Sequence, residues 1–155
     1  MTARPHALTP HLFVKDVTAA ISFYRKAFGA VELFRNVLPN GVILLVELAV
    51  GGGRLFVSEE SPNLNALAPP TVGGTPMLLM LEVDDVDDLA RRAIFAGAEV
   101  EMPVQEMFFG ERYGIVVDPF GHRWSLSTRR EQLTPDDIIR NTQRSIGRAS
   151  CRERV

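Results

Sequence analysis

Apolar and polar residues alternate at the start of the chain in a pattern that predicts a strand followed by an amphipathic helix. In "HLFVKD", His11 and Phe13 fall on one face of the predicted strand, and Leu12 and Val14 fall on the other. In "VTAAISFYRKAF", apolar residues recur at helical spacing. Asp16 precedes this helix and is expected to cap it, because its carboxylate can accept hydrogen bonds from the first free backbone N–H groups.

Three further strands are predicted after this helix. The stretches "VELFRNVL", "VILLVELAV" and "RLFVSE" are rich in β-branched and aromatic residues, and "PNG" and "GGG" separate them as turns. The same order of elements then occurs a second time. Asp16 and Asp85 stand 69 positions apart, and Gly52 and Gly121 have the same offset. We therefore expect an α+β fold built from two tandem βαβββ modules.

The repeat defines the boundaries of a single domain, which we expect to cover residues 7–128. Module 1 is predicted at 7–60 and module 2 at 77–128. The stretch between them, 61–76, is rich in Pro and Gly and is interpreted as a linker.

The C-terminal part of the chain is interpreted separately from the repeat. Residues 129–145 are predicted to form a helical extension, with Thr134 at its N-cap. The following "IGRASCRERV" (146–155) can be written as the reading frame of a common sequencing adapter. We interpret it as an artefactual tail and leave it, with Cys151, out of functional reasoning.

The turn "DPFG" before the last predicted strand raises the question of an active site. Asp118, Pro119 and Gly121 occupy the positions that these residue types favour in a type I turn. The corresponding turn of module 1, "VGGG", contains no catalytic side chain. We therefore interpret Asp118 and His122 as structural, and we expect Trp124 to pack under a helix.

Composition limits the classes of partner. The chain has 17 basic and 19 acidic residues and a formal net charge of -2, which gives no electrostatic reason to bind nucleic acid or an anionic membrane. No apolar run is long enough to span a bilayer, and the N-terminal residues lack the apolar core of a signal peptide. A cytoplasmic protein with neither nucleic acid nor membrane partners is expected.

The motifs of the repeat resemble a known family. "AISFYRKAFGA", "VELAVGGGRLFVSEE" and "GERYGIVVDPFGHRW" are similar to the vicinal oxygen chelate superfamily, which includes glyoxalase I, extradiol dioxygenases and bleomycin resistance proteins, and most of all to its PhnB-like branch. The resemblance implies that the strands form a cup-shaped mixed β-sheet with the helices outside. It also implies a small-molecule ligand, and we expect a homodimer.

Metal-dependent members of this family bind a divalent ion through the first and last strands of each module. The resemblance places those four ligand positions at Thr9, Phe56, Leu78 and Ser125. Leu and Phe have no lone pairs, and divalent ions need three or four imidazole or carboxylate ligands. We therefore expect no metal and no other cofactor.

Alternation places a set of side chains on the cup-facing side of the strands, and "MFFGERYG" adds a loop beside them. Apolar walls with a few polar groups are typical of small-molecule sites. The candidate ligand-binding residues are Thr9, His11, Phe13, Glu47, Phe56, Ser58, Met80, Glu82, Phe108, Tyr113 and Ser125.

Three functions are compatible with these residues. The first is a metal-free binding protein of the sequestration or resistance type. The second is a lyase, isomerase or dioxygenase that uses a noncanonical metal site, for instance His11 with Glu47, or His11 as a general base. The third is a module that only dimerises or regulates, which the polar groups inside the predicted cup disfavour.

Overall fold

The computed structural model describes residues 7–152, and the side chains up to residue 149. The predicted order of elements is confirmed in both halves of the chain. Module 1 consists of β1 (His11–Val14), α1 (Val17–Phe28), β2 (Val31–Val37), β3 (Ile43–Val50) and β4 (Gly53–Glu59). Module 2 consists of β5 (Leu78–Glu82), α3 (Val86–Ala96), β6 (Glu99–Glu106), β7 (Glu111–Val117) and β8 (Arg123–Arg129).

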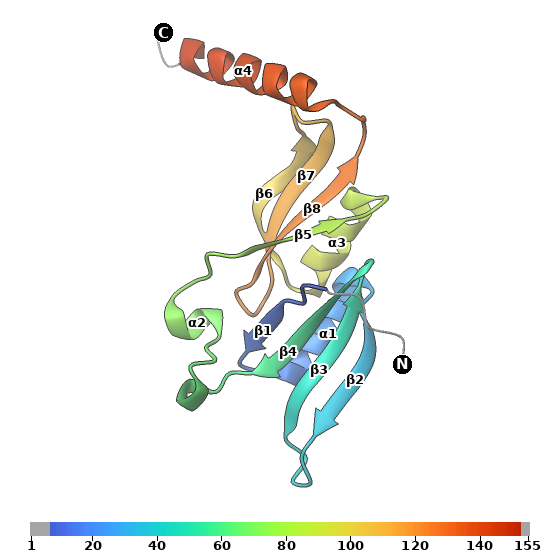
Figure 1. The fold of residues 1–155 in the computed structure, drawn as a ribbon, viewed down its shortest axis with the longest axis vertical. Helices are drawn as coiled ribbons and strands as arrows, with labels where there is room; N and C mark the ends of the chain where they lie inside the picture. Colours follow the sequence, from blue (N-terminus) through green and yellow to red (C-terminus); the bar gives the residue numbers. More distant parts are fainter. Residues whose placement is uncertain (1–6, 153–155) are drawn as a thin grey trace.

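Each module forms its own four-stranded mixed sheet. The strand orders are β1-β4-β3-β2 and β5-β8-β7-β6, with the first strand of each module parallel to the last and the other pairs antiparallel. The two sheets stay separate within the chain and do not close into one cup (Figure 1). The repeated fold is therefore as expected, but one chain supplies two open sheets.

The predicted helix caps are present in both modules. Asp16 accepts a hydrogen bond from Ala19 N at 2.9 Å, and Asp85 accepts one from Asp88 N at 3.0 Å. Gly29 ends α1 with a φ of 65°, a left-handed conformation that costs glycine little because it has no Cβ. These local signals explain why the two helices begin and end where the sequence predicts.

The helices join the two modules. One face of each sheet is covered by its own helix, and α1 packs against α3. Trp124 lies on the helix-covered face of the second sheet and is 3% exposed. Its ring centroid is 4.7 Å from Phe28 and 5.6 Å from Tyr24, so it packs under α1 of the other module. The helix-covered faces of the two sheets are thus turned toward each other, and the opposite faces, called here the outer faces, are turned away.

Asp118 is the polar centre of this junction. It is 4% exposed and accepts hydrogen bonds from Tyr24 Oη at 2.6 Å and Trp124 Nε1 at 3.0 Å. It also accepts from the backbone N–H groups of Phe120 and His122, both at 2.9 Å. Asp118 therefore holds the turn closed and connects it to α1.

The linker is folded onto the modules. It contains a short 3₁₀ helix (Pro62–Leu64) and α2 (Pro69–Val72). Pro69 is buried, and its Cβ would lie 2.8 Å from a Cβ placed on Gly121. Gly121 also has a φ of 90°, so only glycine fits where α2 meets the β7–β8 turn. The linker thereby becomes part of the surface around the first strand of each module.

The C-terminal helix α4 (Pro135–Arg152) projects away from the sheets (Figure 1). The Thr134 hydroxyl accepts a hydrogen bond from Asp137 N at 3.2 Å, so the predicted N-cap is present. The helix runs without interruption into the segment interpreted as an artefactual tail, of which residues 153–155 lie outside the described residues. Over residues 7–152, no helix is long and apolar enough to cross a membrane.

Candidate ligand-binding site

His11 is held in one orientation on the outer face of the first sheet. Its Nε2 lies 2.8 Å from Ser58 Oγ, and Ser58 Oγ donates to the carbonyl of Leu44 at 2.8 Å. A carbonyl can only accept, so the single hydroxyl proton of Ser58 is used there and His11 Nε2 must donate. Nδ1 of His11 is consequently left with a free lone pair. Burial lowers the pKa of His11 below its usual value, which favours this neutral form near pH 7.

Aromatic side chains surround this imidazole. The strand register places His11 beside Phe56 and Phe13 beside Ser58. The imidazole centroid lies 4.4 Å from the Phe13 ring and 5.8 Å from the Phe56 ring, which meets it edge-on. Thr9, just before β1, is partly buried. The structure therefore brings four of the predicted residues of module 1, His11, Phe13, Phe56 and Ser58, together as an aromatic surface around one neutral imidazole.

Glu47 lies on the same face but does not contact His11. It is the cross-strand neighbour of Phe56, and its carboxylate pairs with Arg54 Nη1 at 2.9 Å. A general base is usually oriented by a carboxylate, whereas the partner of His11 is the Ser58 hydroxyl. Among the described residues, His11 thus has a hydroxyl partner, and the carboxylate of Glu47 is paired with Arg54 instead.

The module 2 candidates lie on the outer face of the second sheet. Met80 pairs with Ser125, and Glu82 and Tyr113 both pair with Ser127. Ser125 is 2% exposed and Met80 is 57% exposed. Glu82 forms an exposed ion pair with Arg129 at 3.4 Å. These four predicted residues share a surface of their own, and the chain does not bring that surface against His11.

Phe108 is separate from both groups. It lies in the β6–β7 turn, and its carbonyl accepts a hydrogen bond from Asn141 Nδ2 of α4 at 3.0 Å. The "MFFG" stretch is thus a hairpin turn held by the C-terminal helix, and not a loop over His11.

The two sheets differ at one pair of equivalent positions. Ser127 stands 69 positions after Ser58, and Met80 stands 69 positions after His11. Ser127 is fully buried, and its Oγ has no hydrogen-bond partner among the described residues. Because Met80 replaces the imidazole that satisfies Ser58, only module 1 has a complete polar pair.

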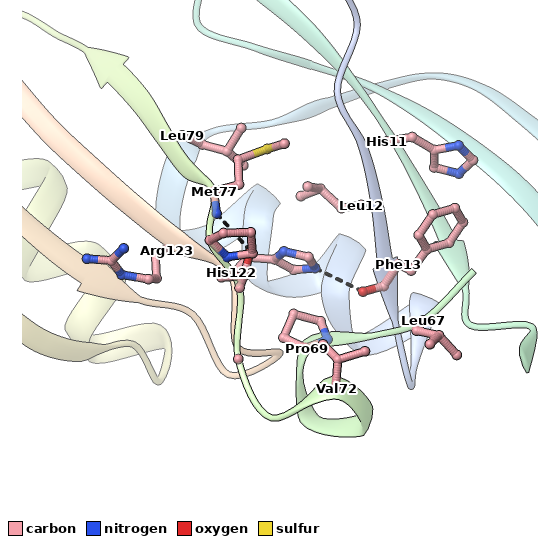
Figure 2. Close-up of a pocket in the computed structure, with 13 residues that line it drawn as sticks. His11, Leu12, Phe13, Leu67, Pro69, Val72, Met77, Leu79, His122 and Arg123 are labelled. Carbon is pink, nitrogen blue, oxygen red and sulfur yellow. Dashed lines mark hydrogen bonds between the residues drawn. The ribbon is translucent and has the colours of Figure 1, made fainter. Parts of the chain in front are cut away.

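A pocket of about 200 Å³ opens beside His11, and the sequence pattern did not predict it. Figure 2 shows it between β1, the linker and the start of β5. His122 closes one side, with its Nε2 2.9 Å from the carbonyl of Phe13. Apolar residues in the linker were the only available signal. The lining residues are His11, Leu12, Phe13, Leu67, Pro69, Val72, Gly74, Thr75, Pro76, Met77, Leu79, His122 and Arg123.

The family's metal positions do not suit a metal in this chain. Phe56 and Leu78 offer no donor atoms, and Thr9 and Ser125 offer only hydroxyls. Phe56 belongs to the first sheet and Leu78 and Ser125 to the second, and Thr9 precedes β1. Within residues 7–149, no group of three or more His, Cys, Asp or Glu side chains is arranged to hold an ion.

Two βαβββ modules, each with its own four-stranded mixed sheet, define a fold of the vicinal oxygen chelate class. The chain belongs to the Glyoxalase/Bleomycin resistance protein/Dioxygenase superfamily, whose family model matches residues 4–126.

Relatives and solved structures agree with this assignment. The chain is 41% identical to an uncharacterized protein of Mycobacterium tuberculosis, over 85% of this chain and 79% of that protein. It is similar to the crystal structure of TioX from Micromonospora, with a TM-score of 0.63, 26% identity, and coverage of 83% of this chain and 100% of that one. The fosfomycin resistance protein FosX from Listeria monocytogenes shares the fold at 17% identity and a TM-score of 0.62, with coverage of 88% of this chain and 99% of that one.

Proposed function

We propose that this protein binds a largely apolar small molecule without a metal, in the manner of a sequestration or resistance protein. The observation that carries the proposal is the His11 site: a neutral imidazole, fixed by Ser58 and flanked by Phe13 and Phe56, at a place where the family's metal donors are missing. Such a surface offers apolar area and one orienting polar atom, but no Lewis acid and no carboxylate to activate a base.

A second copy of the chain is proposed to complete the site. The outer face of the first sheet exposes Phe34 at 52%, and that of the second exposes Met80 at 57% and Leu78 at 39%. Apolar side chains gathered on one face are typical of surfaces that become covered. Because the two outer faces of one chain are turned away from each other, they can meet only between chains. In the proposed homodimer, the second sheet of the partner subunit covers the His11 surface.

The oligomer is tested by light scattering after size-exclusion chromatography. We expect a dimer that Phe34→Glu or Met80→Glu converts to a monomer, because either change places a charge in the covered surface. Phe95→Glu is the matched control, since Phe95 is 96% exposed on α3, away from both outer faces. A wild-type monomer, or a dimer that survives both outer-face changes, would contradict this arrangement.

Metal independence is tested by thermal shift with a small-molecule library, with and without Zn²⁺, Ni²⁺ and Mn²⁺. We expect apolar ligands to raise the melting temperature and the ions to leave it unchanged, because a tight ligand stabilises the folded state by mass action. Ser125→Glu should destabilise the protein without creating an ion-dependent shift, since Ser125 is buried and a charge there has no partner. Ser22→Glu on the exposed face of α1 is the control. One stoichiometric metal per chain, lost in His11→Ala, would overturn the proposal.

A catalytic alternative rests on the free Nδ1 of His11, which could accept a proton from a bound substrate. It predicts that a ligand found by thermal shift is converted to a product and that His11→Phe abolishes the conversion while leaving the ligand bound. Mass spectrometry of the ligand after prolonged incubation decides between the two functions. Unchanged ligand supports binding alone.

A further inference from the structure

The Glu60 carboxylate ties the linker to module 1. Glu60 Oε2 accepts hydrogen bonds from Thr71 Oγ1 at 2.6 Å and from Ala68 N at 3.0 Å, and Glu60 Oε1 lies 3.4 Å from Lys15 Nζ. The hydrogen bond from Thr71, supported by that from Ala68, holds the pKa of Glu60 below its usual value. The group is therefore charged near pH 7, and it connects α2 with the end of β4 and with the residue that follows β1.

Few other interactions hold the linker in place. Among the described residues, its hydrogen bonds to groups outside 61–76 go to Glu60 at its start and Met77 at its end. Ala68 and Pro69 are its buried residues, and Pro69 packs against Gly121 of the β7–β8 turn. Segments with few buried contacts and exposed backbone hydrogen bonds open at a low free-energy cost. We therefore expect the linker to open before either sheet does.

Two glycines supply a hinge at the end of the linker opposite Glu60. Gly73 and Gly74 follow α2 with φ values of 88° and 150°. No atom lies within 4 Å of the place where a Cβ would stand on either residue, so neighbouring groups do not restrict this backbone. Glycine changes between such conformations at little cost because it has no Cβ.

The linker forms one wall of the pocket between β1 and β5. Figure 2 shows Leu67, Pro69 and Val72 of the linker on one side of this pocket and Leu79 of β5 on the other. The volume of about 200 Å³ is below the roughly 300–1,000 Å³ typical of small-molecule sites. β1 and β5 are edge strands of their sheets, so removal of the linker wall would widen the pocket along two strand edges.

We propose that the linker is a lid latched by Glu60. Release of Ala68 and Thr71 from this carboxylate lets α2 move away on the Gly73–Gly74 hinge, and the small pocket becomes a wider opening between the two modules. The pocket seen in the structure is then the closed form of this opening.

Hydrogen–deuterium exchange of the full chain at pH 7, followed by mass spectrometry, tests the latch. In Glu60→Ala, peptides from residues 61–76 should exchange about tenfold faster than in wild type, the equivalent of about one net hydrogen bond. Peptides from β3 and β7 should be unchanged. Glu59→Ala removes the same charge from the exposed neighbouring residue, and it is the matched control.

Thr71→Val keeps the shape of the side chain and removes only the hydroxyl that Glu60 accepts from. We expect a smaller acceleration, about threefold, confined to the same peptides. Unchanged exchange of 61–76 in both variants would overturn the proposal, and so would equal acceleration in all strands. A linker that is already fully exchanged in wild type would also overturn it, because no latch would then be holding the segment.

Thiol labelling tests whether the pocket opens with the linker. Leu79→Cys, in a Cys151→Ser background, places a thiol on the partly buried pocket wall. Its reaction with 5,5′-dithiobis(2-nitrobenzoic acid), a two-ring reagent, should be about tenfold faster when Glu60→Ala is added and unchanged when Glu59→Ala is added. Val42→Cys, at an exposed site before β3, should react at one rate in every background. Equal rates for Leu79→Cys with and without the Glu60 carboxylate would refute the lid.

Neither experiment uses a ligand. A failed lid therefore leaves the proposed binding function standing, and a failed binding function leaves the lid to be judged by exchange and labelling alone. Far-UV circular dichroism of each variant shows whether an accelerated rate belongs to the linker or to loss of the fold, and a spectrum that differs from wild type for both Glu60→Ala and Thr71→Val would count against a local latch.

Discussion

Removal of the Asp118 carboxylate should show how much of the stability depends on the junction between the modules. In Asp118→Ala, the Tyr24 hydroxyl and the Trp124 indole N–H lose their acceptor while remaining buried. An unsatisfied buried donor costs about 1–3 kcal/mol, so two of them cost roughly 2–6 kcal/mol. Loss of the two hydrogen bonds from the backbone N–H groups of Phe120 and His122 lowers the stability further. The total is a large part of the 5–15 kcal/mol or so that is typical of a whole domain.

The assay is urea unfolding followed by tryptophan fluorescence and far-UV circular dichroism. Trp124 is the only tryptophan of the chain, so its emission reports directly on this cluster. Asp84→Ala, at an exposed position without a described partner, is the control and should change stability by less than about 0.5 kcal/mol. Because Tyr24→Phe and Asp118→Ala remove the same hydrogen bond, their combined cost should be smaller than the sum. Additive costs, or a loss below about 1 kcal/mol for Asp118→Ala, would refute the reasoning.

Two further changes test the junction and the outer face. Burial and the neighbouring Asp118 carboxylate raise the pKa of Tyr24 well above its ordinary value near 10. The stability that Tyr24 contributes is therefore fully present below about pH 10 and is lost as the pH rises further. Tyr24→Phe should therefore lose less stability than wild type between about pH 9 and 11, measured by urea unfolding at each pH; equal losses would show that Tyr24 does not govern the alkaline limit. Met80→His should give the Ser127 hydroxyl a hydrogen-bond partner and raise the free energy of unfolding by about 0.5–1.5 kcal/mol. Leu78→His, at another exposed position of the same strand, is the control and should not raise it. Equal effects at Met80 and Leu78 would count against the missing-partner explanation.

Much of the fold could be predicted because its signals are local. Asp16 and Asp85 cap helices through their own side chains, and each cap needs only the next few backbone N–H groups. The strand period fixes which residues share a face, so the sequence correctly grouped His11 with Phe13 and Met80 with Glu82. None of these signals depends on how the modules sit together.

The candidate site was harder to predict because it depends on packing between distant segments. Alternation places His11 on the outer face, but it cannot say that Ser58 fixes its proton or that Glu47 turns to Arg54. The linker has no helix or strand periodicity, so its sequence does not predict that Pro69 packs against Gly121. The pocket it helps to form has no counterpart in strand or helix patterns, which describe one element at a time.

The divergence of the two modules favours a one-sided site. A repeat that only needed a stable sheet could place apolar residues at both equivalent positions, and Met80 shows that module 2 tolerates one there. Module 1 instead retains an imidazole at the matching position and uses a serine hydroxyl and a backbone carbonyl to set its proton. This arrangement leaves Nδ1 of His11 with a defined lone pair, and the proposed binding function uses that lone pair to orient a ligand. Both modules and the linker line the nearby pocket, so the asymmetry between the modules lies in the imidazole and serine pair, which only the first module has.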